Sequence, residues 1–220
     1  PEYMYHAAHG NSDAALDAIF RTNPFPSVTG MICDHPCQLK CTRINYDESL
    51  HIREIKRFEA EHGEVAQHSM QNPSGRSVAV IGAGPAGLSN AWFMRKAGFE
   101  VDVYESKDIN GGMVSAAIPE FRLSPEAIRK DIQRILDSGI RLHEHFKVTP
   151  ENFRTIRESH DAVFIAVGAQ DSVKLRLDGM DAEGVLDPLD FLFNLRSHTP
   201  LSIGNKVVII GGGNTAMDAA

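Results

Sequence analysis

Residues 78–106 read VAVIGAGPAGLSNAWFMRKAGFEVDVYES, and this stretch decides the fold. An apolar segment leads into Gly82, Gly84 and Gly87, which stand in the pattern G-x-G-x-x-G, and a helix-like run follows them. A second apolar segment ends at Glu105, 18 residues after Gly87. Strand, glycine turn, helix, strand and acidic residue in this order predict an α/β dinucleotide-binding domain of the Rossmann-like type.

The three glycines and the acidic residue have separate physical tasks in such a domain. Gly82 permits a tight turn, Gly84 lets the backbone approach a pyrophosphate, and Gly87 allows the helix to pack closely on the strand. The helix N-terminus offers amide groups and a positive dipole to phosphates, and Glu105 can accept hydrogen bonds from a ribose. A carboxylate there would repel a 2′-phosphate, which disfavours NADP and leaves FAD and NAD. A glycine turn without a ligand is the alternative.

Residues 207–220, VVIIGGGNTAMDAA, repeat the same device. Gly211, Gly213 and Ala216 fit the pattern G-x-G-x-x-A, so we expect a strand over 206–211 and a second nucleotide-binding turn. The residue that separates NADH from NADPH is expected about 20 positions beyond the glycines. Because the chain starts without methionine and stops after this turn, we expect it to be an excerpt of a longer protein.

The residues before the first turn favour a small helical domain. The run NSDAALDAIF predicts a helix with Asn11 or Ser12 as its N-cap, and a later helix should end at Gly63. The buried face of the first helix would hold Leu16, Ile19 and Phe20. The turn-rich stretch QNPSG at 71–75 predicts the linker to the α/β part.

Three further elements can be expected beyond the first turn. Ser124, followed by a proline, starts a helix by cap chemistry, and Gly139 marks its end. Its buried stripe would consist of Ile128, Ile132, Ile135, Leu136 and Ile140. His143 and His145 alternate on an expected strand and should face solvent, and another strand is expected within DAVFIAVG at 161–168.

Composition narrows the possible partners. Hydrophobic residues make up 42% of the 220 residues, which suffices for a proper core, and the net charge is −7. No basic stripe interleaved with aromatic residues is present, so nucleic acid and anionic membranes are poor candidates. The apolar runs are short and interrupted by glycine, and no signal pattern opens the chain, so we expect a cytoplasmic protein without membrane insertion.

Cys33, Cys37 and Cys41 recur at every fourth position in MICDHPCQLKCTR and are the only cysteines of the sequence. Three cysteines cannot all pair with one another, and a reducing compartment would keep them as thiols or metal ligands. Iron–sulfur clusters take thiolate ligands, and the spacing suits such a site. The alternatives are a zinc site with His35 as a further ligand and three small packed thiols without a function.

An ordered series of motifs resembles a known family. The motifs are NPFPSVTGMICDHPCQLKC, VAVIGAGPAGL, NGGMVSAAIPEFRL, DAVFIAVGA, GVLDPLDFL and VVIIGGGNTAMDAA. The chain resembles the FAD-dependent iron–sulfur NAD(P)H oxidoreductases, which include the small subunit of glutamate synthase and the N-terminal portion of dihydropyrimidine dehydrogenase. The cysteine stretch is most similar to proteins labelled as selenate reductase subunits.

The resemblance implies where FAD binds. Its ADP half is implied to lie on Gly82, Gly84, Pro85, Ala86, Gly87 and Glu105, and Val148 is implied to meet the adenine. The remaining implied contacts of the pyrophosphate and flavin are Gly112, Met113, Arg122, Ala166, Val167 and Gly168. A salt-bridged arginine is the alternative for Arg122, and a buried strand that ends in a glycine turn is the alternative for 166–168.

The resemblance also implies the other cofactors and the activity. NAD(P)H is implied to bind Gly211, Gly213, Asn214 and Thr215, and Cys33, Cys37 and Cys41 are implied to ligate [4Fe-4S] clusters shared with an upstream cysteine group. The implied function is electron entry: hydride passes from NAD(P)H to FAD, and electrons continue through the clusters to a partner domain or subunit, with no catalytic side chain. The expected domains are 1–72 (iron–sulfur type), 76–202 (FAD-binding) and 203–220 (start of the NAD(P)H-binding domain). The alternative is a non-redox flavin- or NAD-binding scaffold whose cysteine segment holds zinc and docks a partner.

Overall fold

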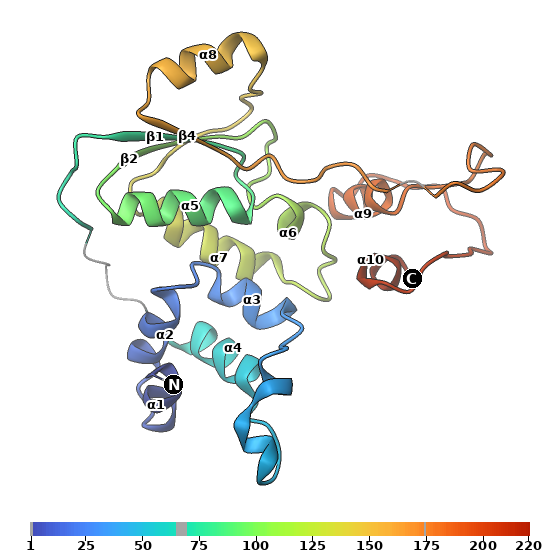
Figure 1. Cartoon of the computed structure of the whole chain (residues 1–220). Helices are drawn as coiled ribbons and strands as arrows, with labels where there is room; N and C mark the ends of the chain where they lie inside the picture. The colour runs from blue at the N-terminus through green and yellow to red at the C-terminus, as the bar shows by residue number, and fades with distance from the viewer. Residues whose placement is uncertain (1, 65–69, 174) are drawn as a thin grey trace.

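The computed structural model describes residues 2–64, 70–173 and 175–220. Figure 1 shows a parallel sheet with helices on both faces, a helical unit beneath it, and the C-terminal helices to one side. The helical unit lies against the helices of the lower face and not against the sheet itself.

The sheet contains four parallel strands in the order β3-β2-β1-β4. The strands are β1 (Ser77–Ile81), β2 (Glu100–Tyr104), β3 (Arg141–His143) and β4 (Ala162–Ile165). Parallel neighbours need crossover connections, and α5 (Pro85–Lys96), α7 (Pro125–Leu136) and α8 (Pro150–Glu158) provide them. α5 and α7 cover one face of the sheet and α8 lies over the other (Figure 1). The predicted α/β fold class and the strand within 161–168 are confirmed.

The helical unit contains α1 (Glu2–Ala8), α2 (Ser12–Phe20), α3 (Pro26–Ile32) and α4 (Ile52–His62). Two short 3-10 helices, η1 (Gln38–Lys40) and η2 (Thr42–Asn45), lie between α3 and α4. The Asn11 side chain accepts a hydrogen bond from the Ala14 amide, which confirms the predicted N-cap of α2. Gly63 follows α4 in an extended conformation, and a Cβ there would lie 2.7 Å from the Ser12 carbonyl oxygen, so close packing requires the glycine.

The helical unit and the sheet unit share one hydrophobic core. Phe20 of α2 packs edge to face on Trp92 of α5, with ring centroids 4.9 Å apart. Both side chains are almost fully buried, as is Val28 of α3 in the same cluster. The helical segment therefore packs on the α/β unit through buried apolar side chains.

The helix predicted after Ser124 is confirmed as α7. The Ser124 hydroxyl accepts a hydrogen bond from the Ala127 amide, and the predicted isoleucine stripe is buried. The remaining helices are α6 (Met113–Ala116), α9 (Pro188–Arg196) and α10 (Asn214–Ala219). α5 and α7 are the longest, with 12 residues each. Within the described ranges, no helix has the length and apolar character needed to cross a membrane.

The strand predicted over 206–211 is wrong. The structure assigns no strand there, and the side chains of Val207, Val208 and Ile210 are exposed. A strand is stabilised by hydrogen bonds to a neighbouring strand and by burial of at least one face, and this segment has neither in the described part of the chain. The apolar pattern indicates only that segment 206–211 favours an extended conformation.

Candidate functional site

The first glycine turn joins β1 to α5, and each glycine has a distinct environment. Gly82 has a φ of +103°, and a Cβ on it would lie 2.4 Å from the Ala166 carbonyl oxygen. A Cβ on Gly87 would lie 1.9 Å from the Gly82 oxygen, so the turn and the helix touch there. Around Gly84 the nearest atom to an added Cβ is the Gly112 Cα, at 3.9 Å. The outer two glycines are therefore required for packing, while the middle one leaves backbone open to a ligand.

The N-terminus of α5 faces this open side without a side-chain cap. Gly84 is the N-cap residue, Pro85 occupies the first helical position, and no side chain accepts a hydrogen bond there. Ala86 and Gly87 follow in the first turn, where amide groups have no partner within the helix. A phosphate would complement both these amides and the positive end of the helix dipole.

Glu105 lies directly after β2 and is 8% exposed. One carboxylate oxygen accepts from the Ala83 amide at 2.7 Å. The other accepts from the Lys107 amide at 2.9 Å and from the Ser106 hydroxyl at 3.2 Å. A carboxylate has about four acceptor positions, so these three donors leave capacity for a ribose hydroxyl.

The other residues predicted to meet the FAD come to the same edge of the sheet. The Gly111 amide donates to the Ala83 carbonyl at 2.8 Å, which sets Gly112 and the start of α6, Met113, against the glycine turn. The Ala166 amide donates to the Ile81 carbonyl at 2.8 Å, so 166–168 leaves β4 beside β1.

Val148 lies on the segment that follows β3. The Phe146 amide donates to the Glu105 carbonyl at 2.7 Å, which brings this segment alongside the end of β2. Val148 is half-buried two residues further on, just before the cap of α8. Val148 thus follows a segment that is bonded to the backbone of Glu105, and its contact with adenine stays a prediction.

The second glycine turn resembles the first, most closely at its middle glycine. Gly211 has a φ of +138°, and Gly213 has φ and ψ of −83° and 175°, against −76° and 178° at Gly84. Asn214 and Thr215 begin α10 as exposed residues. A Cβ on Gly213 would meet no atom within 4 Å, so this turn is open to a ligand.

Arg122 pairs with a residue of α10. Its guanidinium donates to the Asp218 carboxylate at 2.6 Å, and the Asp218 side chain is only 10% exposed. The salt-bridged alternative considered for this arginine is therefore realised in the structure. A position near the flavin stays a prediction for Arg122.

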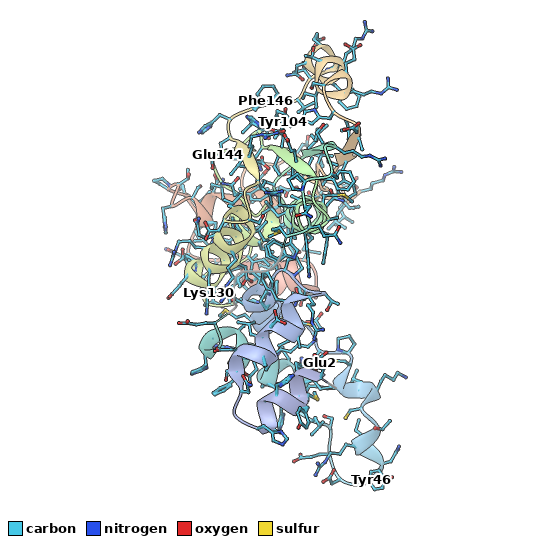
Figure 2. The ribbon with its side chains drawn as sticks, turned by 90° about the vertical axis from the view of Figure 1, so that its left-hand side faces the viewer. Glu2, Tyr46, Tyr104, Lys130, Glu144 and Phe146 are labelled. Atoms are coloured by element: carbon cyan, nitrogen blue, oxygen red, sulfur yellow. The ribbon has the colours of Figure 1, made fainter. Side chains whose placement is uncertain are left out.

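The three cysteines lie on a projecting segment between α3 and α4. Cys33 directly follows α3, Cys37 precedes η1, and Cys41 separates η1 from η2. Figure 2 shows Tyr46, on the same segment, at the end of the molecule far from Tyr104 of the sheet. Backbone hydrogen bonds from Leu50 and Arg43 lower the pKa of the Cys41 thiol.

The thiols are free, and two of them, Cys33 and Cys37, are exposed. In the part of the chain that the structure describes, no three His, Cys, Asp or Glu side chains lie together in a way that could hold a metal ion. Thiolate ligands gather around a metal or cluster because the bonds to it compensate their mutual repulsion. The donor chemistry of the segment fits iron–sulfur ligation, while its role as ligand stays a prediction.

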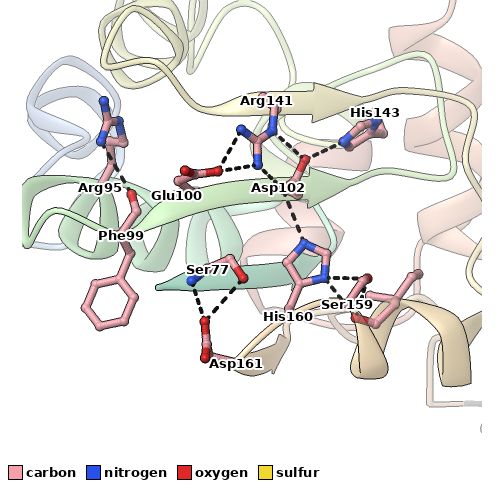
Figure 3. Close-up of polar contacts among 11 residues, drawn as sticks. Ser77, Arg95, Phe99, Glu100, Asp102, Arg141, His143, Ser159, His160 and Asp161 are labelled. Atoms are coloured by element: carbon pink, nitrogen blue, oxygen red, sulfur yellow. Dashed lines mark hydrogen bonds and ion pairs between the residues drawn. The ribbon is translucent and has the colours of Figure 1, made fainter. Parts of the chain in front are cut away.

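One cluster of charged residues was not predicted from the sequence (Figure 3). Asp102, in the middle of β2, accepts two hydrogen bonds from Arg141, at 2.9 and 2.6 Å. His143 and His160 approach the same carboxylate at 2.7 and 3.2 Å. Burial alone would raise the pKa of Asp102, but the hydrogen bonds from Arg141, His143 and His160 outweigh it and hold the pKa well below its ordinary value.

The His143 side chain, predicted to face solvent, is 41% exposed, and its ring also binds Asp102 and stacks on Tyr104 with centroids 4.7 Å apart. Asp102 lies on the sheet face covered by α8, away from the buried Val101 and Val103. An aspartate between two buried valines at the centre of β2 is the signal that could have revealed the cluster. The cluster fastens β3 and the end of α8 to β2.

Two family models match the chain. The model of the pyridine nucleotide-disulphide oxidoreductases matches residues 76–220. The model of domain II of dihydropyrimidine dehydrogenase, described as a 4Fe-4S cluster domain, matches residues 1–68.

Several proteins are similar over nearly the whole chain. The Escherichia coli protein YgfK is 37% identical over 100% of this chain and 22% of its own length. The NADPH-Fe(3+) oxidoreductase subunit beta of Geobacter sulfurreducens is 33% identical, over 99% of this chain and 34% of its own length. The small chain of the Bacillus subtilis NADPH glutamate synthase is 30% identical, over 99% of this chain and 47% of its own length. The chain thus spans less than half of each of these relatives.

Solved structures agree in fold. 2-Naphthoyl-CoA reductase in complex with 2-naphthoyl-CoA is 28% identical with a TM-score of 0.56, over 68% of this chain and 22% of that chain. Mycobacterium tuberculosis FprA in complex with NADPH is 24% identical with a TM-score of 0.51, over 58% of this chain and 30% of that chain. The second likeness concerns the fold alone.

Proposed function

Since the chain belongs to the pyridine nucleotide-disulphide oxidoreductase family, we propose that it forms the electron-entry part of a larger NAD(P)H-dependent oxidoreductase. The family resemblance inferred from the motifs is confirmed, and with it the presence of a 4Fe-4S type domain before the α/β unit. The proposal concerns what this part of the larger protein does.

One observation carries the proposal: a single chain presents two glycine turns whose middle glycines, Gly84 and Gly213, have nearly equal backbone angles. Gly84 and Gly213 each precede a helix in the same extended conformation, and both are open on the ligand side. An FAD enzyme that NAD(P)H reduces binds two dinucleotides, one that enters and leaves and one that stays bound. The two turns support a separate binding site for each dinucleotide.

We assign FAD to the first turn. Its pyrophosphate would lie against Gly84 and the uncapped start of α5, and its ribose would take the free acceptor position of Glu105. Gly112, Met113 and the 166–168 segment would line the path toward the flavin. These residues bind and orient the cofactor, and none of them needs to act as an acid or base.

NAD(P)H would bind the second turn, at Gly211, Gly213, Asn214 and Thr215. When both dinucleotides are bound, the nicotinamide would supply a hydride and the flavin would accept it and pass the two electrons on singly. Cys33, Cys37 and Cys41 would contribute thiolates to the clusters that receive them. A downstream domain or subunit would be the next acceptor.

The proposed domain boundaries are 1–72, 76–202 and 203–220. The core shared by Phe20 and Trp92 supports a fixed position of the first domain on the second. The three free thiols support a reducing compartment, and we propose the cytoplasm.

The test uses the full-length protein purified under nitrogen. Its visible spectrum should show flavin and iron–sulfur absorption, and assays should find iron and sulfide. Addition of NADPH or NADH should bleach the flavin absorption. A colourless protein that contains zinc would favour the scaffold alternative, and a flavoprotein that neither nucleotide reduces would refute electron entry.

A further inference from the structure

The loop 119–123, which follows α6, binds both C-terminal helices through ion pairs. Arg122 donates to Asp218 of α10 at 2.6 Å. Two residues earlier, Glu120 forms an ion pair with Arg196 of α9, with the charged atoms 2.9 Å apart. Figure 1 shows α9 and α10 side by side next to this region, and the two helices contact each other.

One side chain of each pair is largely buried, whereas Arg122 is 29% exposed and Glu120 is 53% exposed. The Asp218 side chain is 10% exposed and the Arg196 side chain 8% exposed, and Arg196 also donates to the Ser115 carbonyl at 2.8 Å. Hydrogen bonds between charged partners are stronger than neutral ones, and removing one partner from a partly buried pair leaves the other charge poorly compensated. The hydrogen-bonded pair of Arg122 and Asp218 therefore restrains geometry more than a surface pair would.

Asp218 lies on α10, close in sequence to the second glycine turn. The helix begins at Asn214, directly after the second glycine turn, so Asp218 lies one helical turn beyond it. Arg122 belongs to the loop after α6, and α6 begins at Met113 beside the first glycine turn. The ion pair thus joins α10, which carries the second glycine turn, to the loop after α6, which begins beside the first glycine turn.

We infer that Arg122 and Asp218 form a positioning pair, which sets the place of the second glycine turn relative to the flavin domain. The inference rests on the proposed function and adds to it the contact that sets the position of one dinucleotide site relative to the other. Neither side chain has to touch a reacting atom for this role. Misplacement of reacting groups by about 1 Å can cost on the order of a hundredfold in rate, so loss of the pair should slow hydride transfer.

The test compares variants of the full-length holoprotein by stopped-flow flavin reduction at saturating NADPH or NADH under nitrogen. Asp218→Asn removes the charge and keeps the shape, and it should slow flavin reduction by about tenfold or more. Nucleotide affinity should change by less than about threefold, and flavin content should stay equal, because both glycine turns remain intact. Asp190→Asn, the same change at an exposed site of α9, serves as the matched control and should react at the parent rate.

The charge swap decides between positioning and direct contact. Arg122→Asp combined with Asp218→Arg should recover most of the lost rate, because the pair is restored in reverse. If Asp218→Asn reduces flavin at the parent rate, or if the swap recovers nothing, the inference is overturned. If the parent itself is not reduced by either nucleotide, the proposed function fails as well, which separates the two failures.

Discussion

The substitution Asp131→Asn tests how the helical unit is held on the α/β unit. Asp131 lies on α7, is 0% exposed, and accepts a hydrogen bond from the Val28 amide at 2.9 Å. Val28 is the third residue of α3, so this carboxylate caps a helix of the other unit. Arg134 approaches it at 3.5 Å. An asparagine would keep an oxygen for the Val28 amide but would carry no charge.

The magnitude follows from the pKa of Asp131. Burial is the largest cause and raises this pKa from 3.8 to about 6, although the Val28 amide and Arg134 oppose it. Two units at 1.36 kcal/mol each give about 3 kcal/mol. Because the folded pKa exceeds the unfolded one, this contribution to stability is fully present below about pH 4 and is lost as the pH rises through about 6.

Urea unfolding of the parent and Asp131→Asn between pH 4 and pH 7.5 measures the effect. The free energy of unfolding of the variant, relative to the parent, should rise by about 2 to 3 kcal/mol over this range, since only the parent must bury a charge. Asp137→Asn, an exposed change on the end of the same helix, controls for general charge effects. A difference between parent and variant that does not vary with pH would refute the reasoning.

Three further predictions concern the flavin site and the sheet. Gly84→Ala should leave the melting temperature nearly unchanged but reduce flavin content, because the new Cβ would meet only the Gly112 Cα, at 3.9 Å. Gly87→Ala should impair folding itself, because its Cβ would lie 1.9 Å from the Gly82 carbonyl oxygen. Calorimetry and flavin absorbance of the purified proteins distinguish the two effects. Glu105→Ala should weaken FAD binding by about 1 to 3 kcal/mol, because the ribose loses its acceptor and the Ala83 amide its partner, and equal flavin content in variant and parent would contradict the assignment. Asp102→Asn should destabilise the fold at neutral pH, and because the pKa of Asp102 is lowered in the folded state, the parent should lose this advantage as the pH falls below about 4 in urea titrations.

Local patterns were sufficient for the elements that carry the first turn. A glycine turn between two apolar strands, and caps such as Asn11 and Ser124, act through residues within a few positions of one another, so the sequence alone predicts them. The segment 206–211 shows the limit of this reasoning. Its apolar residues predict a strand, but pairing depends on a neighbouring strand, which a local pattern does not specify.

Contacts between distant residues could not be predicted in the same way. Arg141 and Asp102 are 39 residues apart, and Arg122 and Asp218 are 96 apart. Each charged residue alone is compatible with a solvated surface, and its partner follows only from strand order and helix packing. These two ion pairs therefore required the structure, whereas Glu105 was predicted from its place after a strand.

The cap on α3 shows what such a distant contact does for the thiol segment. Asp131 and Val28 are 103 residues apart, and the hydrogen bond between them fixes the start of α3 on the α/β unit. α3 has seven residues, roughly 10 Å at 1.5 Å per residue, and Cys33 caps its other end through a hydrogen bond from its amide to the Thr29 carbonyl. α3 therefore connects α7 to the first thiol at a fixed length, so the position of Cys33 is set by the domain that is proposed to hold the flavin. Electron transfer depends on the distance between donor and acceptor. A helix fixed at both ends keeps the distance between Cys33 and the flavin domain from varying with motions of the exposed segment that follows Cys33.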